Sequence, residues 1–197
     1  MQDGTDIIVQ ASTPVTLLGG GEATVADLEE ALSHAPRLVA ADSGAALALA
    51  AGRVPDAVIG DMDSLSDAVR GQLPAGRLHE IAEQDTTDFH KALRSIRAPL
   101  VLGLGFLGRR VDHQLANFSV LVQATGACVL MGARDVVFAA PAGATELGLA
   151  AGTRVSLFPM APVRGRSRGL TWPIAGIDFA PAGRVGTSNR ADGPVRL

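Results

Sequence analysis

Short apolar runs alternate with amphipathic segments over residues 15–125. The apolar runs predict strands at 15–18, 38–41, 57–59 and 100–104, and a more polar extended run at 77–82 predicts a fifth. Between them, apolar residues recur at helical spacing, as Leu28, Ala31 and Leu32 do in the predicted helix 25–35. Short strands that alternate with helices predict an α/β fold built on a doubly wound, mostly parallel sheet.

Polar and glycine residues at the ends of the helical segments support this pattern. Gly52 can end the alanine-rich helix that follows 38–41, in a left-handed conformation. We expect helix starts at three capping signals: Thr24 with Asp27, Ser64 with Asp67, and Thr87 directly before Asp88.

The pattern changes after Gly126. Two apolar runs, 127–131 and 136–139, flank a hairpin-like turn, and residues 153–158 alternate between apolar and polar types. Glycine and proline punctuate the remainder, which predicts a smaller antiparallel β domain, sandwich-like or barrel-like. We therefore expect two domains, 1–126 and 127–197. The second has little core of its own, so it should pack on the first or on a second subunit.

Composition narrows the class of protein. The one cysteine, Cys128, has no partner for an intrachain disulfide and lies in an apolar run, which favours a reduced, cytoplasmic location. The formal net charge of −3 argues against a nucleic-acid surface. No apolar run reaches the roughly 18 residues that cross a membrane, and residues 1–6 lack the basic region of a signal peptide. We expect a soluble protein that binds neither nucleic acid nor membrane.

The candidate chemistry centres on two carboxylates that follow the predicted strand 57–59. Asp61 and Asp63 lie one residue apart after Gly60, on a strand-to-helix loop. In open α/β sheets such loops form the ligand crevice. Two carboxylates this close repel each other unless a cation lies between them, and an all-oxygen cluster suits Mg²⁺ bridging to phosphate. The alternative explanation is local, an Asx turn followed by a helix cap.

Carboxylates recur after two other predicted strands. Asp42 follows 38–41, and Asp85 and Asp88 follow 77–82. Lys91 lies one helical turn after Asp88, where its ammonium group could meet a phosphate. Acidic residues at a helix start also complement the helix dipole, so a structural explanation stands beside the functional one.

Glycine-rich turns are candidate phosphate contacts. Gly19–Gly21 follows the first predicted strand, where its backbone N–H groups could approach a phosphate, or the glycines could simply form a tight strand-to-helix turn. Gly105 and Gly108 follow the strand 100–104 and lead into the last predicted helix.

Charged residues come directly after these last glycines. An arginine beside a glycine turn, here Arg109 or Arg110, suits a clamp on a nucleotide phosphate. Arg110 could equally form a structural ion pair with Asp112. His113 could act as a base or as a hydrogen-bonded structural group.

Trp172, the one tryptophan, lies in a glycine-rich segment of the second half. An aromatic residue in such a unit is usually part of a core, but an exposed indole could stack on a flat ligand or on a cation.

Together these motifs resemble the thiamine pyrophosphokinase family. The resemblance rests on Asp42–Gly44, Gly60–Ser64, Gln84–Phe89 and Gly108–His113 in the first half, and on Val155–Pro159, Gly169–Trp172 and Thr187–Asn189 in the second. It implies transfer of the β,γ-pyrophosphoryl group of ATP to the hydroxyethyl oxygen of thiamine, with Mg²⁺, giving thiamine diphosphate and AMP. It also implies a homodimer, in which thiamine lies between the ATP-binding catalytic half of one subunit and the thiamine-binding β half of the other.

The same resemblance implies roles for individual residues. The acidic set that holds Mg²⁺ and the triphosphate is Asp61, Asp63, Asp85 and Asp88. The catalytic set is Asp61, Asp63, Asp88, Arg110 and Asp112. The nucleotide or phosphate set is Asp42, Gly44, Lys91, Gly105, Gly108 and Arg110. The thiamine set is Trp172, Ser188 and Asn189, with the indole stacking on the ligand rings.

Some positions depart from the family pattern. Ser43 and Ala46 stand where the family usually has glycine and asparagine, and Glu83 replaces a common aspartate. The departures at Ser43 and Ala46 leave open a sensor that binds thiamine or a nucleotide without consuming ATP. A second alternative is a diphosphokinase for another alcohol such as a pterin, in which the first half keeps its chemistry and the β unit binds a different ligand.

Overall fold

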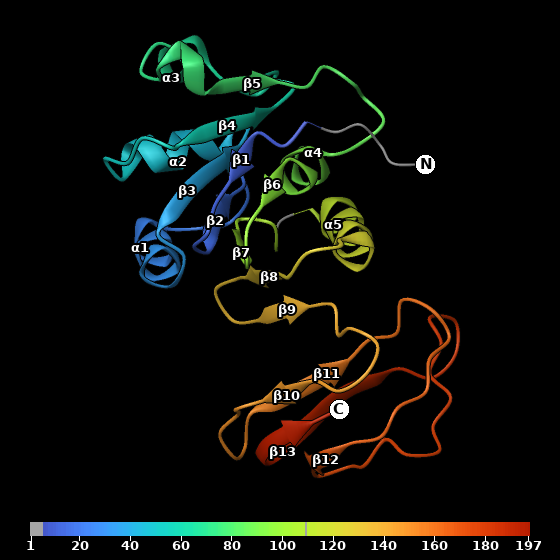
Figure 1. Ribbon diagram of the computed structural model, residues 1–197. Helices are drawn as coiled ribbons and strands as arrows, with labels where there is room; N and C mark the ends of the chain where they lie inside the picture. The colour runs from blue at the N-terminus through green and yellow to red at the C-terminus, as the bar shows by residue number, and fades with distance from the viewer. Residues whose placement is uncertain (1–5, 109) are drawn as a thin grey trace. The chain divides into compact units, whose positions relative to one another are not determined.

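The computed structural model describes residues 6–108 and 110–197 of the 197-residue chain. The chain divides into two compact units, Met1–Ala139 and Ala140–Leu197 (Figure 1).

A mostly parallel sheet forms the centre of the first unit (Figure 1). Its strands are β2 (Val15–Leu18), β3 (Arg37–Ala41), β4 (Ala57–Gly60), β5 (Leu78–Glu80), β7 (Val101–Leu104), β8 (Cys128–Met131) and β9 (Val136–Phe138). β3, β4 and β5 pair in parallel in that order, as do β2, β7 and β8, whereas β9 pairs antiparallel with β8 at the edge. β2 and β3 lie side by side, and Val15 bridges to Pro36. A separate parallel pair joins β1 (Val9–Gln10) to β6 (Ile96–Arg97).

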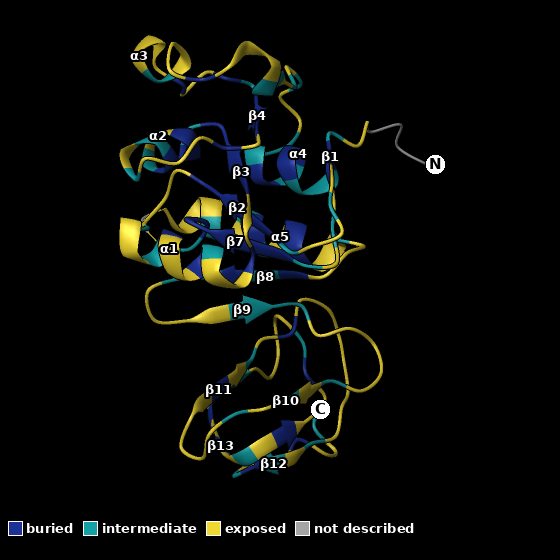
Figure 2. Ribbon diagram, turned by 60° about the vertical axis from the view of Figure 1, so that its left-hand side comes forward, coloured by how far each residue is buried: buried dark blue, intermediate teal, exposed yellow. Residues whose placement is uncertain are grey.

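Helices cover both faces of this sheet (Figures 1 and 2). They are α1 (Val25–His34), α2 (Gly44–Ala50), α3 (Asp67–Arg70), α4 (Asp88–Arg94) and α5 (Val111–Gln123), with a 3₁₀ turn at Ala75–Arg77. α1, α2 and the short α3 pack against one face, and α4 and α5 pack against the other. Within the described residues, the helices are all too short or too polar to cross a membrane.

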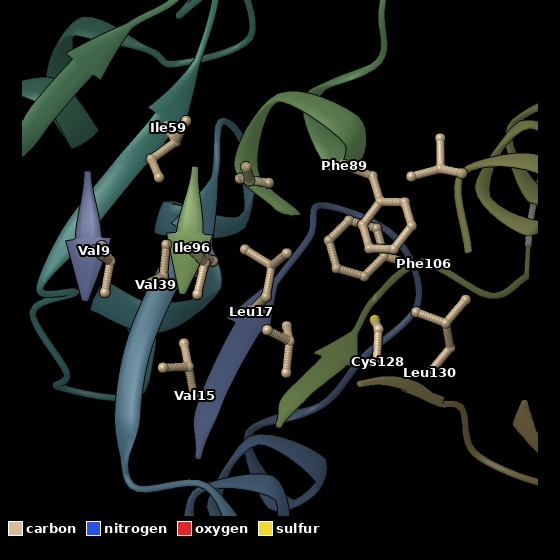
Figure 3. Close-up of a cluster of buried hydrophobic side chains, with 14 of the residues drawn as sticks. Val9, Val15, Leu17, Val39, Ile59, Phe89, Ile96, Phe106, Cys128 and Leu130 are labelled. Atoms are coloured by element: carbon tan, nitrogen blue, oxygen red, sulfur yellow. The ribbon is translucent and has the colours of Figure 1, made fainter. Parts of the chain in front are cut away.

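Burial on both faces explains why the strands read as continuous apolar runs. In β2, Leu17 packs in the cluster that contains Phe89 of α4 (Figure 3). Its neighbour Leu18 packs in the cluster that contains Leu28 of α1. Phe89 also contacts Phe106, with ring centroids 4.4 Å apart. Parallel strands covered on both sides lack the alternation of half-exposed strands, so the doubly wound prediction is confirmed.

Two of the three predicted caps are present. Thr24 accepts a hydrogen bond from the backbone N–H of Asp27, whose carboxylate accepts one from Thr24 in return. Thr87 caps α4 by accepting from the backbone N–H of His90. The predicted start at Ser64 is wrong: α3 begins at Asp67 and its cap is Ser66. The backbone N–H of Ser64 instead donates to the carboxylate of Asp42, a residue distant in sequence.

The hairpin after Gly126 forms as predicted but belongs to the first unit. β8 and β9 pair antiparallel around a turn in which the N–H of Gly132 donates to the carbonyl of Asp135. β8 also pairs in parallel with β7 along its whole length. The hairpin therefore extends the parallel sheet, and the compact unit reaches Ala139 instead of the expected 126.

The second unit is antiparallel, as expected. Its strands are β10 (Glu146–Leu147), β11 (Arg154–Leu157), β12 (Arg168–Leu170) and β13 (Gly186–Arg196), and the long β13 pairs with each of the other three. A small core gathers around Phe179, Ala191 and Val195. The fold class, a parallel α/β unit followed by a smaller antiparallel β unit, is confirmed.

Candidate functional site

Three carboxylates converge at the carboxyl edge of the parallel sheet. Asp42 directly follows β3, Asp61 directly follows β4, and Asp88 begins α4. One oxygen atom of each lies within 4.8 Å of the other two. β3 and β4 are parallel neighbours, so the loops at their carboxyl ends meet. We call Asp42, Asp61 and Asp88 the carboxylate cluster.

Gly60 permits this convergence. A Cβ atom at that position would lie 2.9 Å from Cβ of Asp42 and 3.1 Å from Oδ1 of Asp88. Because Gly60 has no side chain, the side chains of Asp42 and Asp88 can lie close to the end of β4.

Asp42 has an unfavourable backbone conformation and an unfavourable side-chain environment. Its φ angle of 40° is uncommon for residues other than glycine. Its Oδ2 accepts a hydrogen bond of 3.2 Å from the N–H of Ser64, whereas its buried Oδ1 has no hydrogen-bond partner among the described residues. Burial raises the pKa of Asp42, and the carboxylates of Asp88 and Asp61 raise it further. A strained backbone and an unpaired buried acceptor are typical of a site prepared for a ligand.

Lys91 places a buried positive charge next to the carboxylate cluster. Its side chain is 1% exposed, and Nζ lies 2.9 Å from Oδ2 of Asp61 and 3.4 Å from Oδ1 of Asp88. Burial on its own would lower the pKa of Lys91, but the two carboxylates raise it overall, so the group is an ammonium ion. The structure thus places Lys91 in contact with the cluster itself.

The loop that carries Asp61 is tightly turned. Oδ1 of Asp61 accepts a hydrogen bond of 3.2 Å from the N–H of Asp63, and Met62 between them has a φ of 64°. The Asx turn offered as the local explanation is therefore present together with the cluster. The hydrogen bond from Lys91 is the main reason that the pKa of Asp61 is lowered, so Asp61 is a carboxylate at neutral pH.

The cluster fits a small divalent cation. All of its donor atoms are carboxylate oxygens, the ligand type that Mg²⁺ prefers. Three carboxylates and the ammonium of Lys91 carry a formal charge of −2. The unpaired Oδ1 of Asp42 is an acceptor that such a cation would satisfy.

Asp63 and Asp85, the other two residues expected at the metal, lie outside this cluster and are exposed. Asp85 is on a loop that Glu83 organises: the Glu83 carboxylate accepts from the backbone N–H groups of Asp85 and Thr86 and from the guanidinium of Arg94. The glutamate that departs from the family pattern therefore has a structural role in this loop.

The glycines of the predicted phosphate set are sites of close backbone approach. A Cβ at Gly44 would lie 2.0 Å from the carbonyl oxygen of Leu18, and one at Gly105 would lie 2.6 Å from that of Gly19. The N–H of Gly21 donates to the carbonyl of Gly105, so the loops after β2 and β7 are joined. Gly108 has a φ of 97°. These positions require glycine for packing or conformation, whatever they bind.

The arginine expected at the phosphates forms an ion pair. Both guanidinium contacts of Arg110 go to Asp112, at 2.6 and 3.2 Å, and this pair lowers the pKa of Asp112 to about 2. Both side chains are more than 60% exposed. The ion pair between Arg110 and Asp112, the structural alternative to a phosphate contact, is therefore formed at the protein surface. Arg109 lies outside the described residues, and His113 is exposed at the start of α5.

The predicted thiamine residues meet in the second unit. Trp172, Ser188 and Asn189 line an open pocket of about 150 Å³, together with Gly152, Arg154 and Arg190. Asn189 fixes the tryptophan backbone, since its Oδ1 accepts from the N–H of Trp172 at 3.2 Å and its Nδ2 donates to the carbonyl at 2.7 Å. The indole is 57% exposed, so it is not part of the core. Distant segments thus come together as the resemblance implies.

Residues 28–130 match the family model of the thiamin pyrophosphokinase catalytic domain. The chain belongs to this family. The match runs from α1 to β8 and includes every member of the carboxylate cluster.

Sequence relatives agree with this assignment. Thiamine pyrophosphokinase 1 of Oryza sativa subsp. japonica is 30% identical over 154 residues, and thiamine pyrophosphokinase 3 of the same plant is 28% identical over 155 residues. Each alignment covers 68% of this thiamin pyrophosphokinase family member but 58% of the rice protein. The chain thus spans less than two thirds of these relatives.

Solved structures share the fold over the whole chain. The thiamin pyrophosphokinase of Candida albicans has a TM-score of 0.80 at 16% identity, covering 100% of this chain and 90% of its own. Yeast thiamin pyrophosphokinase has a TM-score of 0.78 at 17% identity, covering 100% and 89%. At these identities the similarity shows a shared fold and nothing further.

The sequence assigned Asp42 to the nucleotide or phosphate side, apart from the acidic set expected at the metal. The structure places Asp42 in the carboxylate cluster, where it is the most buried member. The available signal was position, because Asp42 follows its strand just as Asp61 follows the next. The adjacency of β3 and β4, which brings the two together, is a tertiary property.

Proposed function

We propose that this family member is a thiamine pyrophosphokinase that transfers the β,γ-pyrophosphoryl group of ATP to the hydroxyethyl oxygen of thiamine, releasing AMP and thiamine diphosphate. The observation that carries the proposal is the carboxylate cluster, formed inside the segment that matches the family's catalytic domain. The pocket at Trp172 supports an acceptor with a flat ring.

Asp42, Asp61 and Asp88 would hold Mg²⁺, with Asp63 and Asp85 nearby in sequence as further candidate ligands. The metal, when bound, neutralises charge on the phosphate oxygens of ATP. Lys91 contacts Asp61 and Asp88 and holds both carboxylates in place.

Phosphoryl and pyrophosphoryl transfer depend on positioning and charge neutralisation more than on covalent chemistry. In this proposal the glycine loops at Gly44, Gly105 and Gly108 allow the nucleotide to approach the backbone. Arg110, which pairs with Asp112 in this structure, contacts phosphate when the nucleotide binds. Arg110 is exposed enough to exchange its surface ion pair for a phosphate, because an exposed pair contributes little stability.

On the acceptor side, Trp172 stacks on the thiamine rings, Asn189 holds the tryptophan backbone, and Ser188 contributes a polar group at the pocket. We further propose a cytoplasmic homodimer, in which the catalytic unit of one subunit and the β unit of its partner complete each site.

The test is to incubate the purified protein with ATP, Mg²⁺ and thiamine and to resolve the nucleotides and the thiamine species. AMP and thiamine diphosphate that appear in equal amounts are the expected result. ADP with thiamine monophosphate would mean that a different bond is cleaved, and ATP consumption that does not depend on thiamine would overturn the proposed acceptor.

Variants test the roles within the site. Asp61→Asn and Asp88→Asn are each expected to abolish turnover with the unfolding transition retained, whereas Asp67→Asn, an exposed carboxylate of α3 outside the cluster, should keep normal turnover. Activity retained in both cluster variants would rule out the metal assignment.

The homodimer has its own test. Asp61→Asn and Trp172→Ala subunits should each be inactive alone, but a mixture that exchanges subunits should regain activity. In the mixed dimer, the intact catalytic unit of the Trp172→Ala subunit and the intact β unit of the Asp61→Asn subunit form one complete site. A monomer by light scattering, or a mixture without activity, would refute the shared site.

A further inference from the structure

The loop between β5 and α4 leads into the carboxylate cluster. It ends at Thr87, which caps α4 directly before Asp88. Along this loop, the side-chain amide of Gln84 donates to Oδ2 of Asp61 at 3.4 Å. The same oxygen accepts from Nζ of Lys91 at 2.9 Å. The position of the loop therefore affects two members of the cluster.

Glu83 fixes the conformation of this loop. Its carboxylate accepts from the backbone N–H of Asp85 at 2.8 Å, from that of Thr86 at 3.0 Å, and from the hydroxyl of Thr86. Oε1 also accepts from the guanidinium of Arg94 at 2.9 Å. These contacts use the acceptor capacity of the carboxylate. Glu83 therefore acts on the loop and is not itself free to bind a metal ion.

Arg94 ties the loop to α4. It lies in the last turn of the helix, one helical turn after Lys91. The side chains of Arg94 and Glu83 are 27% and 31% exposed, and Nε of Arg94 is buried without a hydrogen-bond partner among the described residues. An unpaired buried donor is unfavourable, so the placement of Arg94 calls for a reason beyond stability. α4 thus holds the loop at both ends, through Asp88 and through the Glu83–Arg94 ion pair.

We propose that the Glu83–Arg94 ion pair positions this loop for cation binding, and so sets the affinity of the carboxylate cluster for Mg²⁺ without touching the metal. The inference rests on the proposed function for the identity of the cation. The cluster has a buried oxygen without a hydrogen-bond partner, Oδ1 of Asp42, which a cation would satisfy. Removing groups that orient metal ligands from outside typically weakens metal affinity about 10–100-fold.

Mn²⁺ is the probe, because it prefers the same oxygen ligands as Mg²⁺ and the EPR signal of the free ion reports binding directly. The whole protein is titrated with Mn²⁺ in the absence of ATP and thiamine, and Mg²⁺ is then added to displace it. We expect Glu83→Gln and Arg94→Met each to raise the Kd for Mn²⁺ about tenfold. The double variant should bind no more weakly than either single variant, because both changes break the same ion pair.

Two further variants serve as controls. Arg94→Lys should retain most of the native affinity, because the positive charge remains. Arg37→Met breaks an exposed ion pair with Asp56 in the same unit, away from the loop, and should bind Mn²⁺ as the native protein does. Unfolding curves establish that every variant is folded. An ion pair that served stability alone would lower the unfolding temperature and leave the Kd unchanged.

Unchanged Mn²⁺ affinity in folded Glu83→Gln, or a native protein that binds no Mn²⁺, would overturn the inference. So would a double variant whose loss of affinity is the product of the two single losses, since the two residues would then act independently.

Turnover separates this inference from the proposed function. The expected affinities in a protein that forms no AMP would support the positioning role and overturn the enzymatic proposal. AMP formation, together with native Mn²⁺ affinity in Glu83→Gln and Arg94→Met, would do the opposite.

Discussion

Replacing Lys91 by methionine tests the electrostatics of the carboxylate cluster. Methionine fills a similar volume but removes the ammonium that lies 2.9 Å from Asp61 and 3.4 Å from Asp88. The variant leaves these two carboxylates, and Asp42 beside them, without a cation in the metal-free protein.

The expected cost follows from burial. Removing one partner of a buried ion pair typically costs about 3–5 kcal/mol, because the other charge is left uncompensated. Asp61 and Asp88 are 15% and 33% exposed, so water recovers part of this loss. We expect the free energy of unfolding in EDTA to fall by about 2–3 kcal/mol, and the unfolding temperature by about 5–10 °C.

The assay compares unfolding with EDTA and with saturating Mg²⁺. A divalent cation at the cluster supplies the missing charge, so Mg²⁺ should stabilise Lys91→Met more than it stabilises the native protein. Arg53→Met is the matched control, since it breaks an exposed ion pair with Glu29 and should cost at most about 1 kcal/mol with a normal response to Mg²⁺. A loss that is the same with and without Mg²⁺ would refute the counter-ion role.

Three further predictions concern stability. Thr24→Ala removes the cap of α1 and should cost about 1 kcal/mol in urea unfolding; no change would mean that the cap contributes nothing. Gly44→Ala places a Cβ 2.0 Å from a backbone carbonyl and should cost about 3 kcal/mol, whereas Gly76→Ala, with open space around it, should be nearly neutral; similar values for both would contradict the packing argument. The raised pKa of Asp42 means that the folded protein binds the extra proton between the ordinary value of 3.8 and the raised one, so metal-free stability falls as pH rises through that window. Asp42→Asn should therefore be more stable than the native protein in EDTA at neutral pH, with the advantage shrinking as pH approaches 3.8; a constant difference would contradict this.

Local signals in the sequence were reliable where the structure depends on neighbours in the chain. Thr24 and Thr87 cap helices through residues three positions away, and Gly52 adopts its left-handed conformation, with a φ of 69°. Ser64 does not cap a helix: α3 starts at Asp67 with Ser66 as its cap, and the N–H of Ser64 bonds to Asp42, distant in sequence. The hairpin of β8 and β9 formed as predicted, but it belongs to the first unit instead of the second. The residues of the hairpin do not reveal that β8 pairs with β7, a strand distant in sequence.

Three features could be predicted from the order of residues alone: the alternation of strands and helices, the placement of carboxylates after successive strands, and the motifs that resemble thiamine pyrophosphokinase. These follow from backbone periodicity, capping and residue chemistry, which act over a few neighbouring positions. The contact of Asp42 with Asp61 and Asp88, the burial of Lys91 beside them, and the pairing of Arg154 with Arg190 could be seen only in the folded chain. Strand order and register set those contacts, and both depend on how distant segments pack.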